Sequence, residues 1–174
     1  MIKLSHSRFS MFLAAALLLT GVPMMASAAS MNKSSAQEFV TKAAATNMLE
    51  IKLGKLALQN STNSDVQQFA HRMITDHSKL QGQLASAAKS ENLTVPSALP
   101  VKLMTQYEQM SKLSGAKFDK AYADFNVKGH EQAVALYKAE AEKSDGMVSQ
   151  FAKQGLPIIQ EHLVLAKRMK QAVK

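Results

Sequence analysis

The feature that most constrains this fold is an apolar residue at every third or fourth position through four long segments. This spacing places apolar side chains along one face of an α-helix. The segments cover residues 35–60, 64–91, 114–143 and 147–173. Helix breakers are scarce, with only 7 Gly and 4 Pro in 174 residues, so little interrupts such helices. The pattern predicts an all-α chain.

The ends of the long segments carry recognisable helix signals. Ser35 with Glu38, and Ser64 with Gln67, form capping-box patterns at the starts of the first two helices. In the last segment, Gly-Leu-Pro at 155–157 should kink or restart the helix because proline removes a backbone hydrogen bond.

The connection between the second and third long helices decides the architecture. Residues 93–100 contain two prolines, and the apolar residues at 101–113 suit a short helix. Two helical hairpins joined by so long a connection predict a ferritin-like four-helix bundle with one long crossover carrying a short helix. In this arrangement the third long helix runs parallel to the second.

The N-terminus has the pattern of a secretory signal peptide. Lys3 and Arg8 precede an apolar run at residues 9–22, and Ala-Ser-Ala at 26–28 suits signal peptidase. The run is shorter than the ~20 residues of a membrane-spanning helix. We therefore expect cleavage near Ala28 and a periplasmic product without stable membrane insertion. This product would have a flexible N-terminus at 29–34 and a bundle domain at 35–173.

Composition excludes several kinds of site and partner. The chain has no Cys, which rules out disulfides, thiolate metal sites, cysteine nucleophiles and c-type haem attachment. Residues 29–174 carry 17 Lys but only Arg72 and Arg168, giving a net charge of +6. Because arginine forks read phosphates and base edges, no nucleic-acid partner is expected. No phosphate-binding loop or nucleophile elbow is present, so the sequence assigns no enzymatic class.

Polar residues interrupt the apolar faces where a core is expected. Glu50, His77 and His162 lie near the middle of such faces, and His130 lies at an edge of the inner stripe of the third long helix. At ~1.5 Å per residue, the four lie between roughly 15 and 24 Å from the same end of the bundle. An unpartnered buried carboxylate or imidazole is costly, so these groups should meet one another or a metal ion.

Three imidazoles and a carboxylate suit a divalent transition metal, and the donors do not choose among Zn²⁺, Cu²⁺, Fe²⁺ and Mn²⁺. We therefore predict a metal site formed by Glu50, His77, His130 and His162. Around these ligands we expect Asp119, Tyr122 and Asn126. The competing interpretation is that each histidine is a core residue satisfied by hydrogen bonds to Glu50, Asp119, Asn126 or Tyr137.

Several short motifs together resemble a known family. They are Phe69-Ala70 with Asp76-His77, Leu113-Ser114-Gly115-x-x-Phe118-Asp119-x-x-Tyr122, His130, and Leu156-Pro157 with His162-Leu163. With the signal peptide, they resemble the exported bacterial domain of unknown function 4142 family, described as ferritin-like. The resemblance runs from about Ser35 to Ala172. It implies a periplasmic ferritin-like bundle and brings no settled activity or cofactor.

The sequence departs from the Glu-x-x-His pattern of metal-binding ferritins. Asp76 and Glu161 are adjacent to His77 and His162, and adjacent helical residues point about 100° apart, so both cannot face inward. This favours a mononuclear, histidine-rich site over a di-iron centre. The alternative function is a metal-free interaction or envelope-stress module. Its surplus surface would be the crossover helix, with Leu103, Met104, Tyr107 and Met110.

Overall fold

Helices account for most of the chain that the structure, a computed structural model, describes: residues 24–143 and 146–173. They are α1 (Met24–Asn60), α2 (Ser64–Ser90), α3 (Val101–Ser111), α4 (Gly115–Ala141) and α5 (Met147–Ala172). No strand occurs in these two ranges, and the all-α prediction is confirmed. Residues 1–23 of the predicted signal peptide lie outside the described residues. None of the described helices combines the length and hydropathy needed to cross a membrane.

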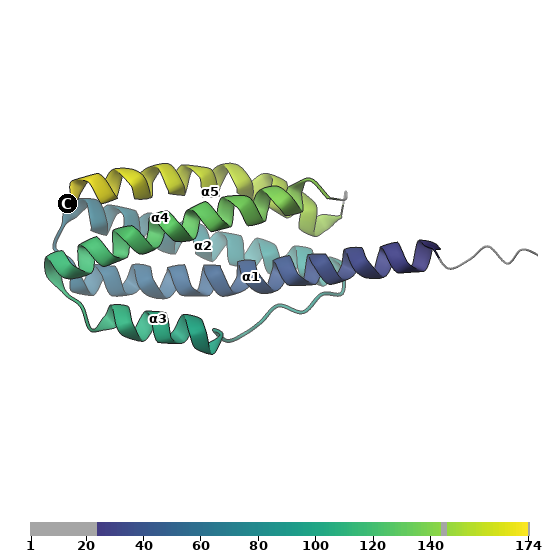
Figure 1. The fold of residues 1–174 in the computed structure, drawn as a ribbon, viewed down its shortest axis with the longest axis horizontal. Helices are drawn as coiled ribbons and strands as arrows, with labels where there is room; N and C mark the ends of the chain where they lie inside the picture. Colours follow the sequence, from purple (N-terminus) through teal and green to yellow (C-terminus); the bar gives the residue numbers. More distant parts are fainter. Residues whose placement is uncertain (1–23, 144–145, 174) are drawn as a thin grey trace, which may run out of the picture.

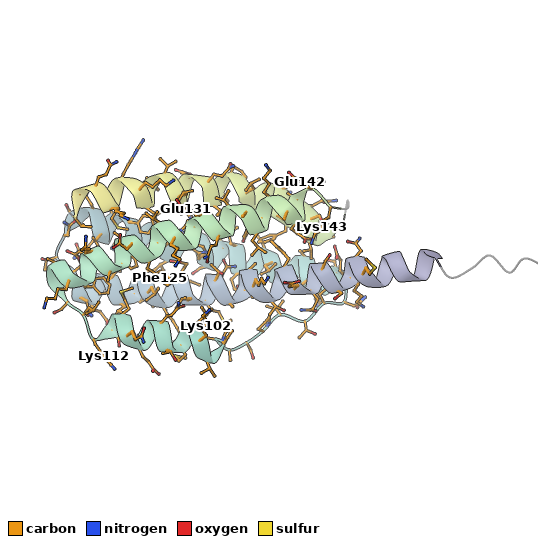
Figure 2. The ribbon with its side chains drawn as sticks, in the orientation of Figure 1. Lys102, Lys112, Phe125, Glu131, Glu142 and Lys143 are labelled. Carbon is orange, nitrogen blue, oxygen red and sulfur yellow. The ribbon has the colours of Figure 1, made fainter. Side chains whose placement is uncertain are left out.

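The four long helices lie side by side as two hairpins (Figure 1). α1 packs against α2 and α4 against α5, while α2 contacts α5 and α1 contacts α4 across the hairpins. Residues 91–100 run back beside the helices to α3, which packs against α1 and α4. α4 consequently runs in the same direction as α2. Charged side chains such as Lys102, Lys112 and Glu131 lie on the exposed outer faces (Figure 2).

The structure corrects several predicted helix signals. α1 begins at Met24 and not at Ser35, whose hydroxyl donates to the Asn32 carbonyl within the helix. α2 is capped by Asn63, one residue before the predicted Ser64, because the Asn63 side chain accepts the backbone N–H groups of the first turn. Residues 29–34, predicted to be flexible, belong to α1.

α5 continues through Pro157 without restarting. The neighbouring Gly155 allows α5 to approach α4 closely, since a Cβ atom at Gly155 would lie 2.7 Å from Cε1 of Tyr137. This part of the Gly-Leu-Pro sequence therefore provides close helix packing.

The apolar core consists of two clusters. One contains residues such as Phe39, Leu84 and Phe151, and the other contains residues such as Leu53 and Met169. Along α2, α4 and α5, buried histidines occupy the sequence positions between the members of these clusters. The helices thus place a polar layer inside an otherwise apolar interior.

Candidate metal centre

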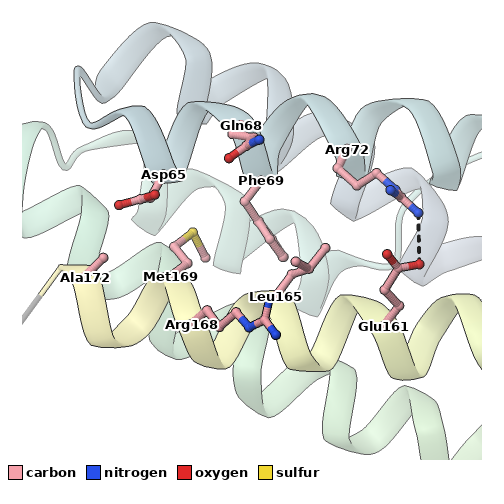
Figure 3. A pocket seen from close by; sticks show the side chains of 9 residues that line it. All are labelled: Asp65, Gln68, Phe69, Arg72, Glu161, Leu165, Arg168, Met169 and Ala172. Atoms are coloured by element: carbon pink, nitrogen blue, oxygen red, sulfur yellow. Dashed lines mark hydrogen bonds and ion pairs between the residues drawn. The ribbon is translucent and has the colours of Figure 1, made fainter.

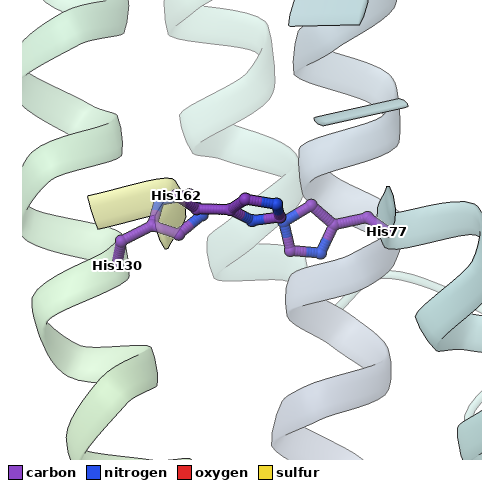
Figure 4. Close-up of side chains that lie close together, drawn as sticks. All are labelled: His77, His130 and His162. Carbon is purple, nitrogen blue, oxygen red and sulfur yellow. The ribbon is translucent and has the colours of Figure 1, made fainter. Parts of the chain in front are cut away.

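Three helices each contribute one histidine to this polar layer: His77 from α2, His130 from α4 and His162 from α5. Their exposed fractions are 1%, 1% and 0%. One ring nitrogen of each lies within 4.8 Å of the other two, and the ring centroids are 5.2–5.8 Å apart. Figure 4 shows the imidazoles gathered at one level. The structure thus brings together three of the four predicted ligands.

Two of the histidines have their tautomer fixed by an acceptor that carries no hydrogen. His130 Nδ1 lies 2.9 Å from the Asn126 backbone carbonyl oxygen. His162 Nε2 lies 3.0 Å from Oδ2 of Asp76. Because a carbonyl or carboxylate oxygen only accepts, His130 carries its proton on Nδ1 and His162 carries its proton on Nε2.

The third histidine is oriented from α1. His77 Nδ1 lies 2.9 Å from Oδ1 of Asn47, and the Asn47 amide donates to Oε1 of Gln81 at 3.1 Å. The donation to Gln81 sets the orientation of the Asn47 amide, so its oxygen faces the ring. His77 therefore donates from Nδ1, and its second nitrogen bears a lone pair.

The other ring nitrogen of each histidine has no hydrogen-bond partner. These atoms are Nε2 of His77, Nε2 of His130 and Nδ1 of His162, and all three are buried. Since the opposite nitrogens hold the protons, each unpartnered nitrogen presents a lone pair. Three buried lone pairs without a donor are a costly arrangement that a cation would relieve.

Burial also keeps the three rings neutral. It lowers the pKa of His130 from 6.5 to about 4, against the opposing effect of the hydrogen bond to Asn126. Burial, followed by repulsion from the other two rings, holds the pKa of His77 well below its ordinary value. Burial likewise lowers the pKa of His162, although Asp76 opposes it. Neutral imidazoles are the form that binds metal ions.

Asp76 connects the centre to the molecular surface. Its Oδ2 accepts hydrogen bonds from both His162 and Nε of Arg72, and Nη2 of Arg72 donates to Glu161 at 3.0 Å. Burial alone would raise the pKa of Asp76, but these bonds to His162 and Arg72 hold it below its ordinary range. Arg72 and Glu161 line a groove of about 450 Å³ between α2 and α5 (Figure 3).

The contact between Asp76 and His162 was not expected from the sequence. Asp76 and His77 indeed do not face the same way, but Asp76 crosses to a different helix and serves the histidine of α5. Asn47 was likewise not predicted as a partner of His77. No local motif in the sequence indicates either pairing.

Glu50, the predicted fourth ligand, is buried on α1 with 2% of its surface exposed. It is not among the groups gathered within 4.8 Å, which in the described residues are the three histidines. Its Oε1 faces Gly129, the residue before His130, where a Cβ atom would lie 3.9 Å away. Its Oε2 has no partner, and burial raises the pKa of Glu50 from 4.5 to about 8.

The residues predicted to surround the ligands are all buried, but they have different roles. Asn126 supplies the carbonyl that orients His130, and its amide donates to the Tyr122 carbonyl. The ring of Phe69 contacts both Tyr122 and His130, with centroids 6.0 and 6.2 Å away. Asp119 precedes His130 by eleven residues, about 16 Å along α4, so it lies away from the histidines.

Two comparisons with known proteins found a match, one with a family and one with a solved structure. The family described as "Domain of unknown function (DUF4142)" matches residues 21–169. A solved structure, described as "putative secreted protein DUF305 from Streptomyces coelicolor", has 13% sequence identity and a TM-score of 0.67. The match covers 81% of this chain and 94% of that chain; at this identity the likeness concerns the fold alone. The search of curated proteins found no match.

Proposed function

The chain belongs to the DUF4142 family, and we propose that it binds one divalent transition-metal ion at the three-histidine centre. The observation that carries this proposal is the unpartnered ring nitrogen on each of His77, His130 and His162. The opposite nitrogen of every ring donates to an oxygen acceptor. Such bonds are typical of metal-binding histidines, because they fix the tautomer and aim the free lone pair.

The competing interpretation, three satisfied core histidines, fits these contacts poorly. A core histidine avoids a buried unpartnered nitrogen by bonding at both ring positions or by pointing one nitrogen to water. Here each ring makes one such bond and leaves the other nitrogen buried among like lone pairs. A bound cation gives all three nitrogens a partner at once.

The donor set favours Cu²⁺, Zn²⁺ and Fe²⁺ over Mn²⁺, since imidazole suits the former ions and oxygen ligands suit the latter. With metal–nitrogen distances of about 2.0–2.1 Å, tetrahedral ligation needs nitrogens about 3.4 Å apart. The rings would therefore close slightly around the ion. Glu50 is the proposed fourth ligand, because its unpartnered Oε2 is buried on the helix facing His130. Water is the alternative occupant of that position.

The setting of the proposed centre is a ferritin-like four-helix bundle whose crossover carries α3. The two packed hairpins and the contacts of α3 with α1 and α4 support this class. The proposed location is the periplasm. The signal-like pattern before Ala28 supports it, as does the description of the structural neighbour as secreted.

Part of the surface that would serve a metal-free interaction module packs against the core of the protein itself. Met110 of α3 has only 8% of its surface exposed, and Leu103 and Tyr107 pack against the same core cluster. Metal binding therefore remains the function we propose.

The test is elemental analysis of protein purified without chelator or affinity tag. Melting curves with Zn²⁺, Cu²⁺, Mn²⁺ and anaerobic Fe²⁺ complete it. Metal should raise the melting temperature, with a stabilisation of about 2.7 kcal/mol at a hundredfold excess over Kd. His77→Ala should abolish the shift, whereas His71→Ala, a change of an exposed histidine on the same helix, should retain it. Absence of bound metal and of any shift with every ion would overturn the proposal.

A further inference from the structure

The carboxylate of Asp76 stands apart from the other acceptors around the histidines. His130 is held by a backbone carbonyl and His77 by a neutral amide, while His162 is held by a carboxylate. Asp76 also reaches across from α2 to α5, although the next residue in the sequence is itself one of the three histidines. Its side chain is 19% exposed, at the boundary between the buried centre and the surface.

We infer that Asp76 is a positioning residue of the proposed metal centre, which selects the tautomer of His162 that leaves Nδ1 free for the ion. The expected effect of Asp76 on metal affinity rests on the proposed function. The expected effect of Asp76 on the tautomer of His162 rests on the hydrogen bond between Asp76 Oδ2 and His162 Nε2.

The chemistry of a carboxylate explains why Asp76 suits this role. An ionised carboxylate accepts hydrogen bonds and donates none, so only the tautomer protonated at Nε2 satisfies the pair. A charge-assisted bond is roughly twice as strong as a neutral one. A carboxylate behind an imidazole also raises the basicity of the ligating nitrogen. An amide in the same place could offer its NH₂ group and stabilise the opposite tautomer.

Arg72 holds the carboxylate in place. Its Nε donates to the same Asp76 oxygen that accepts from His162, and its Nη2 donates to Glu161 at 3.0 Å. Figure 3 shows Arg72 and Glu161 facing each other across the groove between α2 and α5. The two acidic residues bonded to Arg72 differ in their contact with His162. Asp76 touches the imidazole, whereas the half-exposed Glu161 binds Arg72.

This difference provides a matched pair of variants, Asp76→Asn and Glu161→Gln. Each removes one negative charge bonded to Arg72, and only the first replaces the carboxylate bonded to His162. We expect Asp76→Asn to weaken Zn²⁺ binding by about 10–100-fold and Glu161→Gln to change it by less than about twofold. Asp76→Glu keeps a carboxylate and should recover part of the lost affinity.

The tautomer itself is measured on the metal-free protein by ¹⁵N NMR of labelled histidine. Native protein should show His162 protonated at Nε2, and Asp76→Asn should move the proton toward Nδ1. An unchanged tautomer in Asp76→Asn would overturn the inference, as would unchanged Zn²⁺ affinity in a native protein that binds the ion. If the native protein binds no ion, the proposed function fails, while the NMR result still decides the role of Asp76. Should Asp76→Asn fail to fold, Asp76→Glu and Arg72→Gln serve the same NMR comparison.

Discussion

Glu50→Gln tests the energetic cost of the buried carboxylate on α1. Burial raises the pKa of Glu50 from 4.5 to about 8. As pH rises, Glu50 therefore ionises at a lower pH in the unfolded chain than in the native protein. Stability contributed by the neutral carboxyl is therefore present below pH 4.5 and is lost as pH approaches 8. The difference of 3.5 pH units, at about 1.36 kcal/mol each, corresponds to about 5 kcal/mol. At pH 7 the loss is about 3 kcal/mol.

Glutamine keeps the shape of the neutral carboxyl and cannot ionise. Glu50→Gln should therefore match the native protein near pH 4.5 and become more stable than it by about 3 kcal/mol at pH 7. Urea unfolding of the metal-free proteins between pH 4.5 and 8.5 measures this difference, with unchanged m-values as the check on two-state behaviour.

A buried carboxylate with a partner supplies the control for this experiment. Glu140 has 2% of its surface exposed and pairs with Lys143 at 2.8 Å. Glu140→Gln removes half of this pair and should destabilise the protein at pH 7, a change of opposite sign. A Glu50→Gln effect that stays constant across the pH range would refute the reasoning. It would mean that Glu50 ionises in the native state much as it does in the unfolded chain.

Three further predictions concern packing, hydrogen bonding and burial, and urea unfolding tests each of them. Gly54→Ala should lower the free energy of unfolding by about 1–3 kcal/mol, since the new Cβ would lie 2.8 Å from Ile74 Cγ1. Gly82→Ala, with open space around the new atom, should instead raise it by up to about 1 kcal/mol, and equal effects at both sites would contradict the packing. Asn47→Ala should cost about 1–3 kcal/mol by leaving a buried ring N–H without an acceptor; a neutral result would mean that another group replaces the amide. The pKa of His130, lowered from 6.5 to about 4, predicts a native stability that is intact above pH 6.5. Relative to His130→Gln, it should fall by about 3 kcal/mol as pH drops to 4, and a flat difference would place a charged His130 in the native state.

The helices and the three central histidines were predictable because the information is local. Residues three or four apart share a helix face, so a histidine in the middle or at the edge of an apolar stripe is predicted to be buried. A common rise per residue then relates heights on different helices, and this correctly grouped His77, His130 and His162. The start of α1 was wrong by eleven residues, because the capping-box motif at Ser35 also fits the interior of a longer helix.

Hydrogen-bond partners across helices could not be obtained in this way. The Asn47–His77 pair joins residues 30 positions apart, and the Asp76–His162 pair joins residues 86 positions apart. Side-chain reach, helix rotation and packing decide such pairs, and periodicity fixes a helix face only to within about one residue. The same reason explains Glu50: the sequence determined that it is buried, and only the packing of α1 against α4 decided that its Oε1 lies beside Gly129, outside the group of three histidines. The sequence by itself thus determined which residues lie inside, while the tertiary structure decided which atoms meet there and which nitrogen of each histidine remains free.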